Sequence, residues 1–307
     1  MRKIITAFIA GALLAAGVFA ETTTWIGSPS HTLHSENRWS NGFPASGKTG
    51  IINSDAMAGS GTDTTGWTVI QSNGTVTISS NPLQLKGGVK WTMYGGMLNS
   101  AANHINVRDA GSELYMYDGA LYGGRSLQVY DGGTFVQNGG NLTFVEHAYV
   151  YAGGTITVSN GTAQLNTQDG ALGFNIYGAG ALVTFAGGNW TVNGELRLTN
   201  STANAASLRF DLGDGSLTAD SLNITHVGYI DFVNHSDGSL TITGGADFED
   251  LWSSGKIRVD GENNGAFDDH FQVIDGKTLL LIPEPGTISI FLISGMTLMI
   301  YRRHRTR

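Results

Sequence analysis

Short stretches in which apolar and polar residues alternate dominate the chain from about residue 67 to residue 245. The segment GWTVIQSNGTVTISS at residues 66–80 shows this period of two clearly. Such alternation predicts β-strands that bury one face. No long amphipathic helical pattern follows the apolar N-terminal segment, so the pattern predicts an all-β protein.

Pairs of glycines end many of these short strands, and glycine readily adopts the positive φ angles that tight corners need. The pairs are Gly87-Gly88, Gly95-Gly96, Gly123-Gly124, Gly132-Gly133, Gly139-Gly140, Gly153-Gly154, Gly187-Gly188 and Gly244-Gly245. A looser motif recurs as LYMYDGA, LQVYDGG, AYVYAGG and FNIYGAG, with Tyr117, Tyr130, Tyr151 and Tyr177 at spacings of 13, 21 and 26. Two of these spacings fit stacked coils of roughly 20 residues or more.

We therefore predict a right-handed parallel β-helix, a β-solenoid whose coils bury their apolar side chains by stacking on their neighbours. The strand repeats span residues 67–245. The alternative is a β-sandwich of antiparallel hairpins, because the dipeptides Asn73-Gly74, Asn160-Gly161 and Asp214-Gly215 are typical of hairpin turns.

The region at residues 21–66 is expected to form an N-terminal cap. Trp25 and Trp39 flank a polar loop, and Asn41, Gly42 and Pro44 mark turns. This stretch resembles the opening of large bacterial surface proteins with autotransporter-like strand repeats. Two aromatic residues can cover the open end of a strand stack. A sugar-binding tryptophan pair is the other interpretation.

The region at residues 246–282 is expected to form a C-terminal cap. Its pattern predicts one helical turn at Phe248–Trp252 and strands at Lys256–Val259, Phe271–Ile274 and Thr278–Ile282. The last strand is strongly apolar, so we expect it to be buried.

The N-terminus has the pattern of a secretory signal peptide at residues 1–20. Arg2 and Lys3 precede an apolar stretch at residues 4–18, and Val18-Phe19-Ala20 places small residues where signal peptidase cleaves. The expected cleavage lies between Ala20 and Glu21.

The C-terminus combines three features at residues 283–307. Pro283, Glu284 and Pro285 come first, and a run of 16 uncharged residues from Gly286 to Tyr301 follows. Arg302, Arg303, Arg305 and Arg307 end the chain and favour a cytoplasmic position. The apolar run is short for a permanent membrane helix, which needs about 20 residues.

This order of features resembles the PEP-CTERM sorting signal of Gram-negative bacteria. The resemblance implies transient inner-membrane insertion through a short C-terminal transmembrane helix. It also implies recognition by an exosortase, with cleavage near the Pro-Glu-Pro triplet. The expected destination is the cell surface or the extracellular matrix, in association with exopolysaccharide or biofilm.

Amino-acid composition and net charge argue against some classes of function. Glycine accounts for 44 of 307 residues, and the chain has no cysteine, so disulfides do not stabilise it. The formal net charge is −8. It becomes near −13 once the six basic residues of the two terminal signals and Glu284 are removed. This charge argues against nucleic acid and against anionic polymers held by simple attraction, and it is compatible with Ca²⁺ or a neutral glycan.

Candidate ligand sites are weak, and we expect no cofactor or metal. Asp260, Glu262 and Asn264 are spaced like the start of an EF-hand loop, but Phe271 occupies the twelfth position, where a glutamate is needed. A simple turn explains the segment better. His31 and His34 lie three residues apart in a predicted loop, and this spacing is the only feature that suggests a metal site there.

Catalysis is the alternative to a structural role. Polysaccharide lyases and glycosidases need grouped carboxylates or basic residues. Asp118 and Asp131 each follow a tyrosine of the recurring motif, and Arg108 and Arg125 lie near in sequence. Stacked coils would align Asp118, Arg125 and Asp131, although aspartate is also common in turns for local reasons.

The sequence thus favours a non-enzymatic, structural or adhesive matrix protein, exported and sorted by its tail. A carbohydrate-active enzyme on the same scaffold is the alternative hypothesis.

Overall fold

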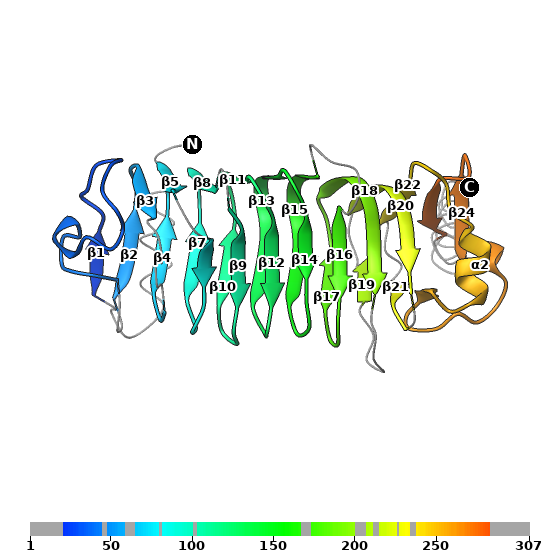
Figure 1. Ribbon diagram of the computed structural model, residues 1–307. Coiled ribbons are helices and arrows are strands. Elements are labelled where there is room, and N and C mark those ends of the chain that lie inside the picture. Colours follow the sequence, from blue (N-terminus) through cyan, green and yellow to red (C-terminus); the bar gives the residue numbers. More distant parts are fainter. Residues whose placement is uncertain are drawn as a thin grey trace, which may run out of the picture.

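The structure is a computed structural model. It describes residues 21–44, 48–58, 65–79, 82–100, 103–166, 173–199, 207–210, 215–225, 227–233 and 238–282. Short strands stack side by side in one long row from the N-terminal to the C-terminal end (Figure 1). Nearly all strand pairs are parallel. The predicted β-solenoid is therefore confirmed, and the alternative β-sandwich is wrong. The expected signal peptide and sorting tail lie outside the described residues.

The strands form three faces of the solenoid, which we call faces A, B and C. Face A contains β1 Thr22–Thr24, β2 Thr49–Ile52, β4 Thr68–Gln71, β7 Lys90–Met93, β10 Glu113–Met116, the first parts of β13 Thr134–Phe144 and β15 Thr155–Leu165, β17 Leu182–Phe185, β19 Ser207–Phe210, β21 Tyr229–Phe232 and β23 Ile257–Val259. Face B contains β3 Ala56–Ala58, β5 Thr75–Ile78, β8 Met97–Ser100, β11 Ala120–Gly123, the second parts of β13 and β15, the first parts of β18 Asn189–Thr199 and β20 Ser216–Ile224, and β22 Ser239–Ile242. Face C contains β6 Leu83–Leu85, β9 Ile105–Arg108, β12 Leu127–Tyr130, β14 Ala148–Val150, β16 Phe174–Tyr177 and the second parts of β18 and β20.

Inward side chains of successive coils stack into columns that form the core. On face A the register places a fully buried residue of each coil directly against its neighbour. This column contains Val69, Trp91, Leu114, Phe135, Ile156, Val183, Leu208, Ile230 and Ile257. Burial of one such side chain contributes roughly 1.5–3 kcal/mol. The alternation of apolar and polar residues thus arises because every second side chain enters a shared core.

The corner between faces A and B depends on a column of glycines with positive φ. Gly96, Gly119, Gly140 and Gly161 stack in successive coils, with φ between 74° and 101°. A Cβ on Gly119 would lie 2.5 Å from the carbonyl oxygen of Gly96, and one on Gly140 would lie 2.6 Å from that of Gly119. These carbonyls accept hydrogen bonds from the next coil, as in the 2.9 Å bond from the Asn141 N–H to Gly119. The backbones therefore approach closely because no side chain separates them.

Two buried glutamines secure the same corner from inside. The amide of Gln137 donates to the carbonyls of Gly140 and Thr162, and its Oε1 accepts from the Trp190 indole at 2.8 Å. Gln71 forms the same arrangement with the Trp91 indole. A polar side chain inside the core is stable here because all of these hydrogen bonds are made.

The N-terminal end carries the predicted aromatic cap. The rings of Trp25 and Trp39 meet edge to face at 5.4 Å, and both side chains are almost fully buried. Their indoles donate to the carbonyls of Asp55 and Leu33. A short 3₁₀ helix, η1 Glu36–Arg38, lies in the loop between them. Such buried rings are unavailable to a sugar, so the sugar-binding interpretation of this pair is not supported.

The C-terminal end is closed by α2 Phe248–Ser253, α3 Phe267–His270 and two antiparallel strands. The strand β25 Thr278–Leu281 pairs with β22 and with β24 Phe271–Ile274. These elements match the predicted helical turn and terminal strands, whereas α3 was not predicted. Among the helices of the described residues, none combines the length and apolar character that a membrane crossing requires.

The glycine column leads to a stability prediction. We expect Gly119→Ala to lower the free energy of unfolding by about 3 kcal/mol or more. The reason is that the new methyl group meets backbone atoms and also needs a positive φ, which alone costs about 1–2 kcal/mol. Urea unfolding followed by circular dichroism measures the change.

Gly180→Ala is the matched control. Gly180 also has positive φ, at 70°, but a Cβ there would meet no atom within 4 Å. Only the conformational cost should appear. Equal destabilisation by the two substitutions would show that corner packing is not the limiting contact.

Candidate functional site

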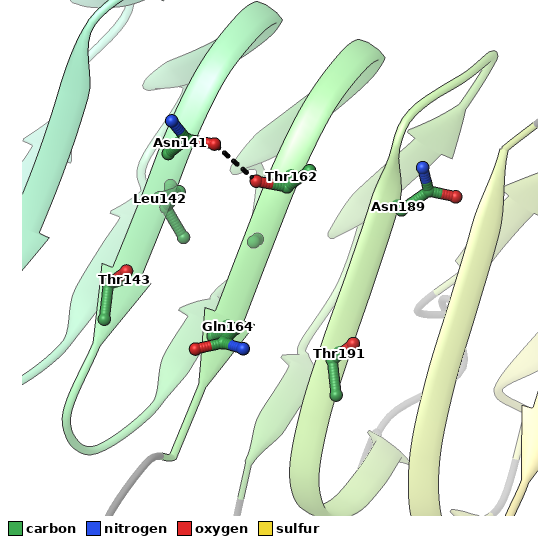
Figure 2. A pocket seen from close by; sticks show the side chains of 8 residues that line it. Asn141, Leu142, Thr143, Thr162, Gln164, Asn189 and Thr191 are labelled. Carbon is green, nitrogen blue, oxygen red and sulfur yellow. Dashed lines mark hydrogen bonds between the residues drawn. The ribbon is translucent and has the colours of Figure 1, made fainter.

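A polar surface lies on face B. We call it the amide–hydroxyl face and define it by outward side chains on β13, β15 and β18: Asn141, Thr143, Thr162, Gln164, Asn189 and Thr191. Figure 2 shows these side chains along three neighbouring strands. With Leu142 and Ala163 beneath them they line a hollow of about 450 Å³.

The face is uncharged well beyond this hollow. Outward positions in register along face B from β5 to β22 carry no charged side chain, and the exposed Asp220 follows them on β20 where its face B part ends. Towards the C-terminal end the pattern continues with Ser216 and Thr218 on β20 and with Ser239 and Thr241 on β22. In a chain with 42 charged residues in total, 17 basic and 25 acidic, such a long neutral strip distinguishes this face.

Hydrogen bonds between coils orient the asparagine amides. The Thr162 hydroxyl donates to Asn141 Oδ1 at 2.7 Å, as the dashed line in Figure 2 shows. The Ser216 hydroxyl donates to Asn189 Oδ1 at 2.6 Å. Because each amide oxygen is already an acceptor, the Nδ2 groups are left to donate outward. The face thus offers fixed donors and hydroxyl groups to a ligand rich in oxygen atoms.

The residues considered for catalysis do not converge. Asp118 lies at the corner between faces A and B, where its Oδ1 accepts from the Gly119 N–H at 2.7 Å. Arg125 lies at the corner between faces B and C and pairs with Glu146 at 3.0 Å. Asp131 lies at the third corner, with a φ of 52°. The expected alignment of these three residues is therefore wrong.

The reason is that the tyrosine motif has no single position in the coil. Tyr117 follows β10 on face A, whereas Tyr130 ends β12 on face C. Their spacing of 13 residues is less than one coil, so the aspartates after them cannot stack. Tyr130, Tyr151 and Tyr177 do occupy equivalent positions in successive coils. Arg108, the other basic candidate, lies over the Tyr130 ring at 6.0 Å.

The segment that resembles an EF-hand start is a turn held by its own hydrogen bonds. Asn264 Nδ2 donates to a Glu262 carboxylate oxygen, and His270 Nε2 contacts the Asn264 carbonyl at 2.8 Å. Asp260 has a φ of 50° and precedes Gly261, whose N–H donates to Asp231. Within the described ranges, no group of three or more histidine or acidic side chains is arranged to hold a metal ion.

The two N-terminal histidines are engaged separately. His31 Nδ1 lies 2.6 Å from the Ser28 hydroxyl. The His34 ring packs against the rings of Phe43 and Trp67 at 6.2 and 5.6 Å. Their side chains therefore make local contacts with other residues.

A charged ladder near the C-terminal end of face A was not predicted. Arg209, Asp231 and Arg258 occupy neighbouring strands in register. Burial raises the pKa of Asp231, while the Gly261 N–H and the Arg209 guanidinium oppose that shift. The Arg258 guanidinium also lies 4.2 Å from the Tyr229 ring centroid. The effect of burial is the largest, so the net pKa of Asp231 is raised.

The amide–hydroxyl face was also missed, although the sequence contains a signal for it. The triplets Asn141-Leu142-Thr143, Asn189-Trp190-Thr191 and Ser216-Leu217-Thr218 share a polar–apolar–hydroxyl order. They join into one surface only because the coils stack in register.

Comparison with known proteins gives no relative. No protein-family model gives a significant match to the chain, and neither do curated proteins or solved structures.

The dispersal of the acidic candidates leads to a prediction. We expect the double variant Asp118→Ala and Asp131→Asn to change the free energy of unfolding by less than about 0.5 kcal/mol, since both side chains are exposed. Asparagine is chosen at position 131 because it tolerates positive φ. Polysaccharide binding should also be unchanged.

The measurements are thermal unfolding and retardation in polysaccharide gels. A reducing-sugar assay serves as the counter-test. Glycan cleavage by the unmodified protein that disappears in the double variant, with an unchanged far-UV spectrum, would establish the enzyme hypothesis instead.

Proposed function

We propose that this protein is an exported matrix protein that binds a neutral polysaccharide along the amide–hydroxyl face. The observation that carries the proposal is the long uncharged strip of amide and hydroxyl groups on face B. Amides and hydroxyls exchange hydrogen bonds with sugar hydroxyls, and a rigid sheet presents them without an ordering cost. The absence of charge favours a neutral polymer over an acidic one.

The geometry suits an extended ligand. Equivalent side chains repeat along the solenoid at the strand spacing of about 4.8 Å. A polymer that lies along the axis therefore meets an amide or hydroxyl group again at each coil from β13 to β22. Individually weak contacts then add up along the chain.

The alternative, a carbohydrate-active enzyme, has less support. It requires carboxylates or basic residues within reach of one bond. The candidates Asp118, Arg125 and Asp131 lie at three different corners. The role we propose is accordingly structural or adhesive.

The terminal segments support the proposed location. A signal peptide ending at Ala20 and a tail similar to the PEP-CTERM signal fit export, transient inner-membrane insertion and release or attachment at the cell surface. Signal peptidase and an exosortase would be the processing partners. Exopolysaccharide is the proposed matrix partner.

The binding function is tested by removing the polar groups of the amide–hydroxyl face. We expect the variant Asn141→Ala, Thr162→Ala, Gln164→Ala and Asn189→Ala to bind at least about tenfold more weakly. The reason is that each lost hydrogen bond contributes roughly 0.5–1.5 kcal/mol, and about 1.4 kcal/mol corresponds to a factor of ten. Affinity electrophoresis in gels containing hydroxyethyl cellulose, dextran, pullulan or galactomannan measures the dissociation constant.

The control variant carries Thr134→Ala, Thr155→Ala, Thr157→Ala and Thr184→Ala, which are outward positions of face A in the same part of the solenoid. It should bind like the unmodified protein. The proposal is wrong if none of the four polymers retards the unmodified protein, or if both variants lose affinity equally.

Processing of the tail is tested by mass spectrometry. We expect the surface form of the protein to end close to Pro283–Pro285, because the apolar run after this triplet is short for a permanent anchor. The corresponding N-terminus should be Glu21. Finding the tail arginines Arg302, Arg303 and Arg305 on most mature molecules would contradict the sorting hypothesis.

A further inference from the structure

A row of tyrosines on face C forms a surface separate from the amide–hydroxyl face. Tyr130, Tyr151 and Tyr177 occupy the same position in three successive coils. Their ring centroids lie 6.0 and 6.2 Å apart, with the rings nearly perpendicular. Tyr149 stacks on Tyr151 at 5.3 Å. We call these four residues the tyrosine column.

The column remains open to solvent at its C-terminal end, although aromatic side chains are usually buried. The Tyr177 side chain is 42% exposed, and the others are partly exposed. Burial raises the pKa of Tyr149 and Tyr151 above the ordinary value.

Amide side chains accompany the tyrosines along the face. The register joins Gln128, Tyr149 and Asn175 across neighbouring strands. Asn175 Oδ1 is buried and has no hydrogen-bond partner among the described residues. An unpaired buried acceptor is unfavourable, and a hydroxyl group of a ligand can offset this cost by donating a hydrogen bond.

The chemistry of this surface indicates its ligand. In these three coils the outward side chains of face C are amides and tyrosines, flanked by Arg108 over the Tyr130 ring and by Arg197 in register with Asn175. Aromatic rings pack on the apolar side of a sugar ring, and neighbouring amides bond to its hydroxyls. Repetition at each coil suits a polymer, because the strand spacing of about 4.8 Å is similar to the length of one pyranose residue.

The two surfaces point in different directions at the same height of the solenoid. Strand β13 contributes to the amide–hydroxyl face. The strand before it in the chain, β12, contributes Tyr130 to face C. The corner between faces B and C carries the ion pair of Arg125 and Glu146. A chain that lies along the axis on one face therefore cannot also occupy the other face.

We propose that the tyrosine column binds a second neutral polysaccharide chain, so that one molecule bridges two chains. This inference rests on the proposed function of the amide–hydroxyl face. It adds a second, independent binding surface and a cross-linking role.

Bridging is tested with beads coated with the polymer that retards the protein most strongly in gels. We expect the unmodified protein to aggregate these beads. The variant Tyr151→Ala and Tyr177→Ala should lose aggregation while it still binds a single bead surface through the amide–hydroxyl face. In the background of the four-alanine variant of that face, the same two substitutions should weaken the remaining binding at least tenfold.

Tyr94→Ala and Tyr117→Ala together form the matched control. These two rings stack at 5.0 Å near the corner of faces A and B and are also exposed, at 37% and 44%. Their removal should leave aggregation unchanged. Circular dichroism and thermal unfolding show that each variant is folded.

The outcomes separate the two proposals. No gel retardation of the unmodified protein refutes the polysaccharide-binding function itself. Retardation without bead aggregation, or aggregation that survives loss of Tyr151 and Tyr177, overturns the bridging inference alone. Equal loss of aggregation in the control variant also overturns it.

Discussion

Close stacking of the backbone at the corner of faces A and B is the constraint on which the rest of this structure depends. Each coil must place its carbonyl groups within hydrogen-bonding distance of the next coil, and a Cβ at Gly119 or Gly140 would occupy that space. Glycine satisfies both the positive φ and the short approach. Once the corner is fixed, the register of both adjoining faces follows. The core columns and the outer polar rows are consequences of this register.

The sequence predicts the strands better than it predicts their arrangement. Period-two alternation located β4 and β5, because a strand with one buried face has an apolar side chain at every second residue. The terminal strands β24 and β25 were also located, although β25 is a continuous apolar run without alternation. Asn73-Gly74 is different, because a hairpin and a solenoid corner both need positive φ at Gly74. Only the parallel pairing of the flanking strands decides between them.

The surfaces were harder to predict than the fold because they depend on coil length. In the parallel register Thr134 pairs with Thr155, and Thr155 pairs with Leu182. The numbers of residues between these partners differ, so consecutive coils differ in length. A fixed period cannot find such partners. Tyr130, Tyr151 and Tyr177 were recognised as a repeat, yet Tyr117 was wrongly grouped with them. The contacts of face B, such as Thr162 with Asn141, link residues about one coil apart and have no local signature.

The direction of the strands also has a mechanical consequence. In this solenoid the covalent chain runs across the long axis, and the hydrogen bonds between coils run along it (Figure 1). Tension along the axis is therefore carried by hydrogen bonds and core contacts, with the coils loaded in series. Most contacts join neighbouring coils, so the molecule yields coil by coil and lengthens greatly before its backbone is taut. In a network of polymers such a protein would behave as an extensible link that absorbs strain.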